Sequence, residues 1–129
     1  MALYLLDTDA VIDHLNGYEP TTSLLVGLLD AGDLLATNAV VVAEVHSGLA
    51  AEGRILADEF LSELQFLELT PSVARRAGDL RHDAARRGHT LALADVLNAA
   101  SALEHGATLV TGNMRHYRPA GVPTLALPR

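Results

Sequence analysis

The sequence predicts an α/β fold in which helices cover both faces of a mostly parallel central sheet of four to five strands. Apolar runs of strand length recur along the chain, and longer segments with helical spacing separate them. This alternation is typical of parallel strands joined by crossover helices. A length of 129 residues with 50% apolar content suits one domain over residues 1–129.

In the first half of the chain, strands are predicted at residues 3–6 and 34–36, where LYLL and LLA are continuously apolar. A helix is predicted to begin near Asp9, and another over residues 21–31, where leucines and a valine recur at helical spacing before Gly32. Asn38 is a typical N-cap for a helix that runs to about Leu49 and passes Gly48 near its end.

In the second half, residues 51–64 separate apolar from charged positions as an amphipathic helix does. Strands are predicted at 66–69, 108–110 and 122–126. Thr70-Pro71 is a typical helix start, and that helix is predicted to run to about Arg87 before Gly88. A last helix is predicted over residues 94–105, with Gly106 as its stop.

Composition excludes several classes of protein. The chain has no cysteine, which excludes disulfides, thiolate catalysis and zinc held by thiolates. Its apolar runs fall far short of the roughly 20 residues of a membrane-spanning helix, and residues 1–6 lack the basic leader of a signal peptide, so a cytoplasmic location is expected. The net charge of −7 argues against broad attraction to polyanions, although arginines or a divalent cation can reverse the field at one groove.

Three carboxylates lie far apart in the sequence, each at the edge of an apolar segment: Asp7, Glu44 and Asp95. An ionised carboxylate loses hydration at such positions and needs compensation by a cation or by hydrogen bonds. Gathered together, they would suit a hard cation, and oxygen ligands without thiolates or clustered histidines favour Mg²⁺ or Mn²⁺ over zinc. Each acid also has a purely structural explanation.

The sequence Asp7-Thr8-Asp9 leaves function open. A strand that ends in Asp-x-Asp is compatible with a metal-binding pair, or with the nucleophile and acid of a small aspartate-dependent phosphatase. The phosphatase needs a cation, usually lysine, to hold the phosphoryl group, and the chain has no lysine. Alternatively, Asp7 or Thr8 simply caps the following helix.

Glu44 follows Val-Val-Val-Ala, which leaves no wet face on that side of its helix, so an inward-facing, compensated carboxylate is predicted over a solvated one. Asp95 lies in a similar apolar setting, but an acid in the first turn of a helix is also favoured by the helix dipole. Asn98, one turn further on, shares the face of Asp95.

Arginines are the candidate substrate-binding residues. On the helix over residues 70–87, Arg75 with Asp79 and Asp83 with Arg87 have the i, i+4 spacing of solvated ion pairs. Candidates for contact with a substrate phosphate are those that follow Asn113 or lie at the helix end: Arg115, Arg118 and Arg86 (or Arg87). His116 and Tyr117 are predicted to pack the loop rather than stack on a base.

Four segments taken together resemble a known family. LLDTDAVID, then AEVHSGL, then LALADVLNAASALEHG and ATLVTGNMRHY stand in the order and spacing of PIN-domain ribonucleases, most closely the VapC toxins of bacterial and archaeal toxin–antitoxin pairs. The resemblance spans nearly the whole chain, and it implies a single PIN domain over residues 1–129 with a PIN-like three-layer α/β/α sandwich.

The resemblance also implies a site. The metal-binding acids of the family fall on Asp7, Glu44 and Asp95, and its fourth polar position falls on Asn113, with Thr111 beside it. Asn113 departs from the aspartate often found there, so a second metal would be held less tightly. Asp9, where many relatives have Ser, Thr or Asn, is either an outer-shell acid or a solvated one.

The implied activity is Mg²⁺-dependent (or Mn²⁺-dependent) hydrolysis of RNA by in-line attack of water, leaving 5′-phosphate and 3′-hydroxyl ends. The implied partners are a VapB-type antitoxin and a second toxin copy in a homodimer. Asn113 and the net acidity leave a catalytically weak, RNA-binding PIN module as an alternative.

Overall fold

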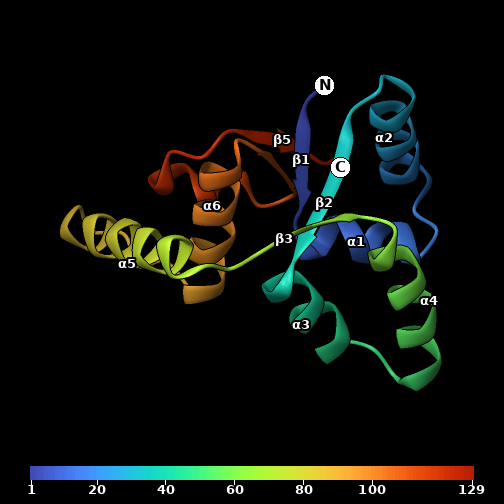
Figure 1. Ribbon diagram of the computed structural model, residues 1–129, viewed down its shortest axis with the longest axis horizontal. Helices are drawn as coiled ribbons and strands as arrows, with labels where there is room; N and C mark the ends of the chain where they lie inside the picture. The colour runs from blue at the N-terminus through green and yellow to red at the C-terminus, as the bar shows by residue number, and fades with distance from the viewer.

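The computed structural model describes all residues, 1–129, and shows a five-stranded sheet in which every neighbouring pair of strands is parallel. The strand order is β3-β2-β1-β4-β5, so β1 lies in the centre (Figure 1). The strands are β1 (Leu3–Leu6), β2 (Leu34–Asn38), β3 (Gln65–Leu67), β4 (Thr108–Thr111) and β5 (Thr124–Ala126).

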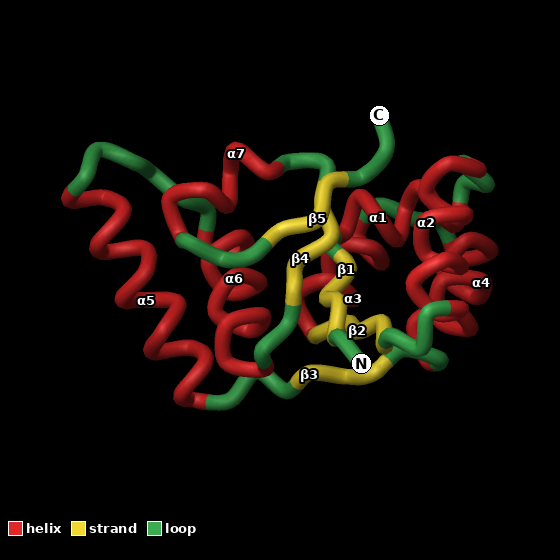
Figure 2. The backbone as a smooth tube through the Cα atoms, turned by 90° about the horizontal axis from the view of Figure 1, so that it is seen from above, coloured by secondary structure: helices red, strands yellow, loops and turns green.

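Helices cover both faces of this sheet, which confirms the three-layer sandwich. Viewed from above, α5 and α6 lie on one side of the strands and α1, α2 and α4 on the other (Figure 2). The helices are α1 (Thr8–Leu15), α2 (Glu19–Asp30), α3 (Ala39–Ser47), α4 (Ala51–Ser62), α5 (Pro71–Arg86), α6 (Leu93–His105) and α7 (Met114–Tyr117), followed by a 3₁₀ turn, η1 (Arg118–Ala120).

Two apolar cores fill the spaces between the layers, and alternation along the central strand feeds both. Leu5 packs into the core beneath α5 and α6, whereas its neighbour Leu6 packs into the core beneath α1 to α4. Both side chains are fully buried. Successive residues of a strand point to opposite faces, so a strand covered on both sides reads as one continuous apolar run.

The predicted helix boundaries are largely confirmed, with identifiable caps. The Asn38 side chain accepts a hydrogen bond from the Val41 amide at 3.0 Å, and Thr70 accepts one from Val73 at 3.2 Å. Gly106 ends α6 in the left-handed conformation, with φ of 65°, where a side chain would be strained.

Some predicted features differ in the structure. Helix α2 begins at Glu19 rather than residue 21, because Pro20 suits the first turn of a helix and extends it upstream. Strand β5 begins only at Thr124, and α7 was not predicted because four residues are too short to show periodicity.

The ion pairs predicted along α5 were wrong. Arg76, rather than Arg75, is paired, and it reaches Glu104 of α6 at 3.1 Å. The Arg87 guanidinium donates to the main-chain oxygens of Asp83 and Pro119 instead of the Asp83 carboxylate. Helix-to-helix contacts therefore take precedence over the local i, i+4 pairs. None of the helices combines the length and the apolar composition that a membrane-spanning segment needs.

Candidate active site

The candidate site lies at the carboxyl ends of the two central strands. Chain connections leave β1 in opposite directions, with β2 on one side and β4 on the other. Open parallel sheets bind ligands at such a switch point, where the helices that follow the strands diverge. Asp7 directly follows β1 and Thr111 ends β4, so the fold brings together residues that are more than a hundred positions apart.

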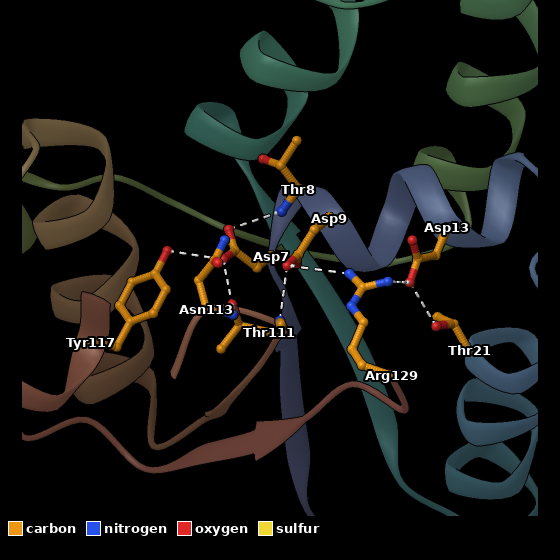
Figure 3. Close-up of polar contacts among 10 residues, drawn as sticks. Asp7, Thr8, Asp9, Asp13, Thr21, Thr111, Asn113, Tyr117 and Arg129 are labelled. Carbon is orange, nitrogen blue, oxygen red and sulfur yellow. Dashed lines mark hydrogen bonds and ion pairs between the residues drawn. The ribbon is translucent and has the colours of Figure 1, made fainter. Parts of the chain in front are cut away.

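Asp7 is the central residue of this site. Only 7% of it is exposed, and its carboxylate is held by hydrogen bonds on both oxygens. Oδ1 accepts from the Thr8 amide at 2.9 Å, which makes Asp7 the N-cap of α1, and Oδ2 accepts from the Thr111 hydroxyl at 2.8 Å and the Tyr117 hydroxyl at 3.1 Å (Figure 3). The capping role and a role in the site therefore coexist in one residue.

Tyr117 connects Asp7 to Asp95. The Tyr117 hydroxyl lies 3.1 Å from Asp7 Oδ2 and 3.3 Å from Asp95 Oδ1, and the ring is buried. A phenol has one hydrogen to donate, so it serves one carboxylate at a time. Two carboxylates thus meet around a single donor, and any further stabilisation of their negative charge must come from elsewhere.

The closeness of the two carboxylates changes the pKa values of Asp95 and Tyr117, the two groups that face Asp7. Burial, and then the negative charge of Asp7, raise the pKa of Asp95, while His116 and the Tyr117 hydroxyl partly offset this rise. Burial, and then Asp7, also raise the pKa of Tyr117 far above its usual range, so the phenol stays protonated and acts as a donor. The site therefore favours positive charge, whether a proton or a cation.

Glu44 departs from its predicted setting. Its residue is exposed on α3, where Val41 and Val45 take the buried positions, so the prediction of an inward-facing carboxylate was wrong. Its Oε1 accepts a hydrogen bond from the Thr8 hydroxyl at 2.8 Å, which places it beside the residue that follows Asp7. No three acidic or histidine side chains converge closely enough to hold a metal ion together.

The turn after β4 carries the fourth polar position. The main-chain N–H of Asn113 donates to the Thr111 hydroxyl at 3.0 Å, and the same hydroxyl donates to Asp7. Asn113 is exposed, whereas Thr111, two residues earlier, is buried. Asp9 accepts a hydrogen bond from the Gly112 amide at 2.8 Å. The structure therefore places the turn directly against the first turn of α1.

Asn98 lies deeper than the site. It is fully buried, and its side-chain oxygen accepts a hydrogen bond from the Asn38 side chain at 3.1 Å. This contact ties α6, which carries Asp95, to the carboxyl end of β2. The structure gives Asn98 a role in fixing α6 against the sheet, and its supporting role for Asp95 stays a prediction.

An open cleft of about 380 Å³ borders Asp95, and Arg115 and His116 are among the residues that line it. The loop between α5 and α6 forms its other wall, with His89 and Thr90. The other two candidate arginines line separate hollows, Arg86 beside Arg87, and Arg118 beside Met114. Of the three, only Arg115 shares a cleft with one of the candidate catalytic acids.

The donor set of the site fits a hard divalent cation at Asp7 and Asp95. Both residues offer carboxylate oxygens, and both lie within hydrogen-bonding distance of the Tyr117 hydroxyl. Burial, and then the charge of Asp7, raise the pKa of Asp95. Oxygen ligands of this kind suit Mg²⁺ or Mn²⁺. Glu44 lies near enough to Thr8 to approach the same region, but its exposed side chain must move to join them.

The raised pKa of Asp95 predicts how a divalent cation affects stability at different pH. In the metal-free protein, ionising Asp95 costs stability, and this cost is absent below the unfolded carboxyl pKa of about 3.9 and complete above the raised folded value. A bound cation removes the cost. Mg²⁺ should therefore raise the melting temperature more at about pH 7.5 than at about pH 4.5.

Thermal unfolding with and without Mg²⁺ at the two pH values measures this effect. Asp95→Asn removes the titrating group, so the shift caused by Mg²⁺ should become small and nearly independent of pH. An equal shift at both pH values in the unaltered protein, or a full shift in Asp95→Asn, would contradict the assignment of Asp95.

A comparison with protein families identifies the family of this chain. The PIN domain model matches residues 4–122, which is nearly the whole chain and includes every site residue described above. The chain belongs to the PIN-domain family. Among the curated relatives of this PIN domain is Ribonuclease VapC19 of Mycobacterium tuberculosis, 31% identical over 115 residues, with 88% of this chain and 90% of that protein covered.

Ribonuclease VapC2 of Rickettsia felis is 26% identical over 130 residues, and the alignment covers 97% of this PIN domain and 96% of that protein. Among solved structures, VapBC2 from Rickettsia felis, bound to a DNA fragment from the promoter, superposes with a TM-score of 0.87 at 23% identity. That match covers 98% of this chain and 99% of the other, and it confirms the fold.

Tyr117 was predicted from the sequence only to pack the loop. The structure confirms the packing, because the ring is buried against the core beneath α5 and α6, but it adds the hydroxyl contacts to Asp7 and Asp95. A signal was present in the spacing, because Tyr117 follows Asn113 by one helical turn and so points back toward the end of β4. His116, by contrast, is exposed and lies 3.9 Å from Asp95.

Proposed function

We propose that this PIN domain is a divalent-metal-dependent endoribonuclease and the toxin of a VapBC-type toxin–antitoxin pair. The observation that carries the proposal is the meeting of Asp7 and Asp95 around one phenol at the carboxyl edge of the sheet. The relatives named as ribonucleases, at 31% and 26% identity over most of their length, support RNA as the substrate.

Mg²⁺, or Mn²⁺ in its place, would be held by Asp7 and Asp95, with Glu44 joining them and Asn113 facing the same edge. When bound, such a cation neutralises charge on the scissile phosphate and lowers the pKa of the attacking water. In this proposal hydrolysis leaves 5′-phosphate and 3′-hydroxyl ends. The residues of the chain fix the geometry: Thr111 and Tyr117 hold Asp7 so that its carboxylate cannot rotate away.

Cleavage of RNA by the purified protein tests the proposal. A panel of transfer, ribosomal and messenger RNA is incubated with Mg²⁺, Mn²⁺ or EDTA, next to para-nitrophenyl phosphate as the small phosphate ester. We expect RNA fragments only with metal, and fragments with 5′-phosphate ends that a 5′-phosphate-dependent exonuclease degrades. Cleavage that persists in EDTA, or turnover of the small ester alone, would overturn the proposal.

Arg115 is proposed to contact an RNA phosphate, because it lies in the cleft beside Asp95. Arg115→Gln should raise KM about tenfold, the effect of losing one hydrogen bond to a charged group, and leave kcat nearly unchanged. Steady-state cleavage kinetics measure this. Arg86→Gln and Arg118→Gln should change KM less, since those side chains line other hollows. An equal effect of all three substitutions would point to general charge rather than the cleft.

The proposed partners are a VapB-type antitoxin and a second copy of the toxin. Solved structures with this fold include the VapBC complexes of Rickettsia felis and Salmonella typhimurium. A small apolar hollow of about 130 Å³ lies beside α2 and α4 and has room for an apolar side chain of a partner; it is lined by Leu29, Leu34, Leu35, Phe60 and Leu64 among others. A short neighbouring reading frame whose product co-purifies with this chain would support the pairing.

A further inference from the structure

Arg129 lies beside the candidate site, three residues after β5 ends at Ala126. The Leu127 amide donates to the Thr111 main-chain oxygen at 3.0 Å, and the Leu127 side chain is buried, which anchors the segment after β5. From there the Arg129 guanidinium extends between two acids of α1: one nitrogen lies 2.9 Å from Asp13 Oδ2 and another 3.7 Å from Asp9 Oδ2 (Figure 3).

Asp9 is a carboxylate that needs this neighbour. Its Oδ2 accepts the Gly112 amide at 2.8 Å, whereas its Oδ1 is buried and has no hydrogen-bond partner. Burial, and then the charge of Asp7, raise the pKa of Asp9, while the hydrogen bond from the Gly112 amide and then the charge of Arg129 partly offset this rise. Without a fixed positive charge, repulsion from Asp7 would turn the Asp9 side chain toward solvent and away from Gly112.

Gly112 fits closely between Asp9 and Arg129. A Cβ atom on this residue would lie 2.8 Å from Asp9 Oδ2 and 3.0 Å from the nearer Arg129 nitrogen. Gly112 also connects the two polar residues of the turn, Thr111 and Asn113, which are bonded to each other through the Thr111 hydroxyl. Contacts at Gly112 therefore set where this turn stands relative to Asp7.

We propose that Arg129 is a positioning residue for the nuclease site: it holds the Asp9 carboxylate against the Gly112 amide and thereby fixes the Thr111–Asn113 turn beside Asp7. The proposal rests on the proposed function for its kinetic consequence. An exposed ion pair alone is worth little, and the Arg129 side chain is 48% exposed. Its effect here comes from geometry, because the planar fork of arginine spans two carboxylates at fixed separation.

Asp13 completes the arrangement from the other side. Its Oδ2 accepts both the Arg129 guanidinium and the Thr21 hydroxyl, each within 2.9 Å. Thr21 is fully buried at the start of α2, so Asp13 has a rigid support. The guanidinium is thus held on a fixed acid while its other nitrogen faces Asp9. Lysine carries one compact charge and would neutralise one carboxylate but not span both.

Arg129→Gln tests the proposal with two measurements on the full chain. Steady-state RNA cleavage should show kcat lowered about tenfold with KM changed by less than about twofold, as for outer-shell partners of a metal site. In the metal-free protein, amide exchange of Gly112 measured by NMR should become about tenfold faster, since its acceptor is no longer held. Arg129→Lys should recover part of both effects.

Arg76→Gln is the matched control. Arg76 makes a comparable ion pair with Glu104, at 3.1 Å and with 43% of its side chain exposed, but on α5 and α6 away from the turn. It should leave kcat and Gly112 exchange unchanged. Gly112→Ala gives a second test, because its added Cβ would push the Asp9 carboxylate and the Arg129 guanidinium apart from the turn without removing the Arg129 charge. It should lower kcat in the same way with KM nearly constant.

Two results would overturn the proposal. One is a rise in KM with unchanged kcat in Arg129→Gln, which would mean direct contact with the RNA backbone. The other is Gly112 exchange no faster than in the Arg76→Gln control. The exchange measurement needs neither RNA nor metal, so it tests the contact even if the unaltered protein cleaves no RNA and the proposed function itself fails.

Discussion

Asp7→Asn is expected to lower metal-dependent RNA cleavage by about 10³-fold, because it removes the buried carboxylate that both Thr111 and Tyr117 hold in place. Asparagine keeps the shape and can still accept hydrogen bonds from Thr111 and Tyr117 through its oxygen. It cannot supply the negative charge that holds a divalent cation. Single-turnover cleavage with saturating protein measures the loss without interference from product release.

Stability should move little in this variant, and this separates chemistry from folding. Losing the Asp7 charge relieves repulsion on Asp95, which offsets the weaker hydrogen bonds that the substituted amide oxygen accepts. The matched control is Asp79→Asn, an exposed acid on α5 with no side-chain contact to the site. Activity of Asp7→Asn within about tenfold of the control would contradict the assigned role of Asp7.

Tyr117→Phe is expected to lower cleavage about 10- to 100-fold, the usual cost of losing a hydrogen-bond partner of a metal ligand. The same change should lower the free energy of unfolding by about 1–3 kcal/mol, because a buried donor disappears while the Asp7 carboxylate stays. Cleavage kinetics and urea unfolding measure the two effects. The Phe ring fills the same space, so the packing of Tyr117 in the core is retained.

Tyr4→Phe is the control for the loss of a tyrosine hydroxyl, since Tyr4 lies on β1 but makes no hydrogen bond to the site. It should leave both activity and stability close to those of the unaltered protein. If Tyr117→Phe behaved like this control, the Tyr117 hydroxyl would have no part in holding Asp7 and Asp95. Loss of stability without loss of activity would limit Tyr117 to the fold.

The fold was predictable because its signals are local. Leu3–Leu6 is an uninterrupted apolar run, as a central parallel strand requires, and Asn38 and Thr70 cap the helices that they were predicted to start. The errors fall where a boundary depends on three-dimensional packing. The predicted start of β5 at residue 122 is an example, since Val122 is buried in the core but forms no ladder with β4.

The candidate site was predictable only in its acids and its order along the chain. Asp7 and Asp95 could be named, because a carboxylate at a strand end or inside an apolar helix needs compensation. The contact of the Tyr117 hydroxyl with both acids depends on helix α7. This helix has four residues, which are too few to show helical periodicity in the sequence. Arg129 was equally hidden, since nothing local relates it to Asp9 or Asp13.

Glu44 and the arginines of α5 show why pattern alone misplaces charged side chains. The apolar run before Glu44 suggested burial, yet the α3 surface at that residue is open and Thr8 lies within reach. The expected pairing of Arg75 with Asp79 yielded to contacts between α5 and α6 through Arg76. The partner of a long charged side chain depends on which other elements pack beside it, and the spacing along one helix does not predict that.

Asp7 and Asp95 are proposed to hold one cation together. Calorimetric titration of Mn²⁺ into the unaltered protein, Asp7→Asn, Asp95→Asn and the double variant tests it most directly. We expect one bound Mn²⁺ in the unaltered protein, loss of that binding in each single variant, and no further loss in the double variant. Binding that survives either substitution, or losses that simply add, would contradict a shared site.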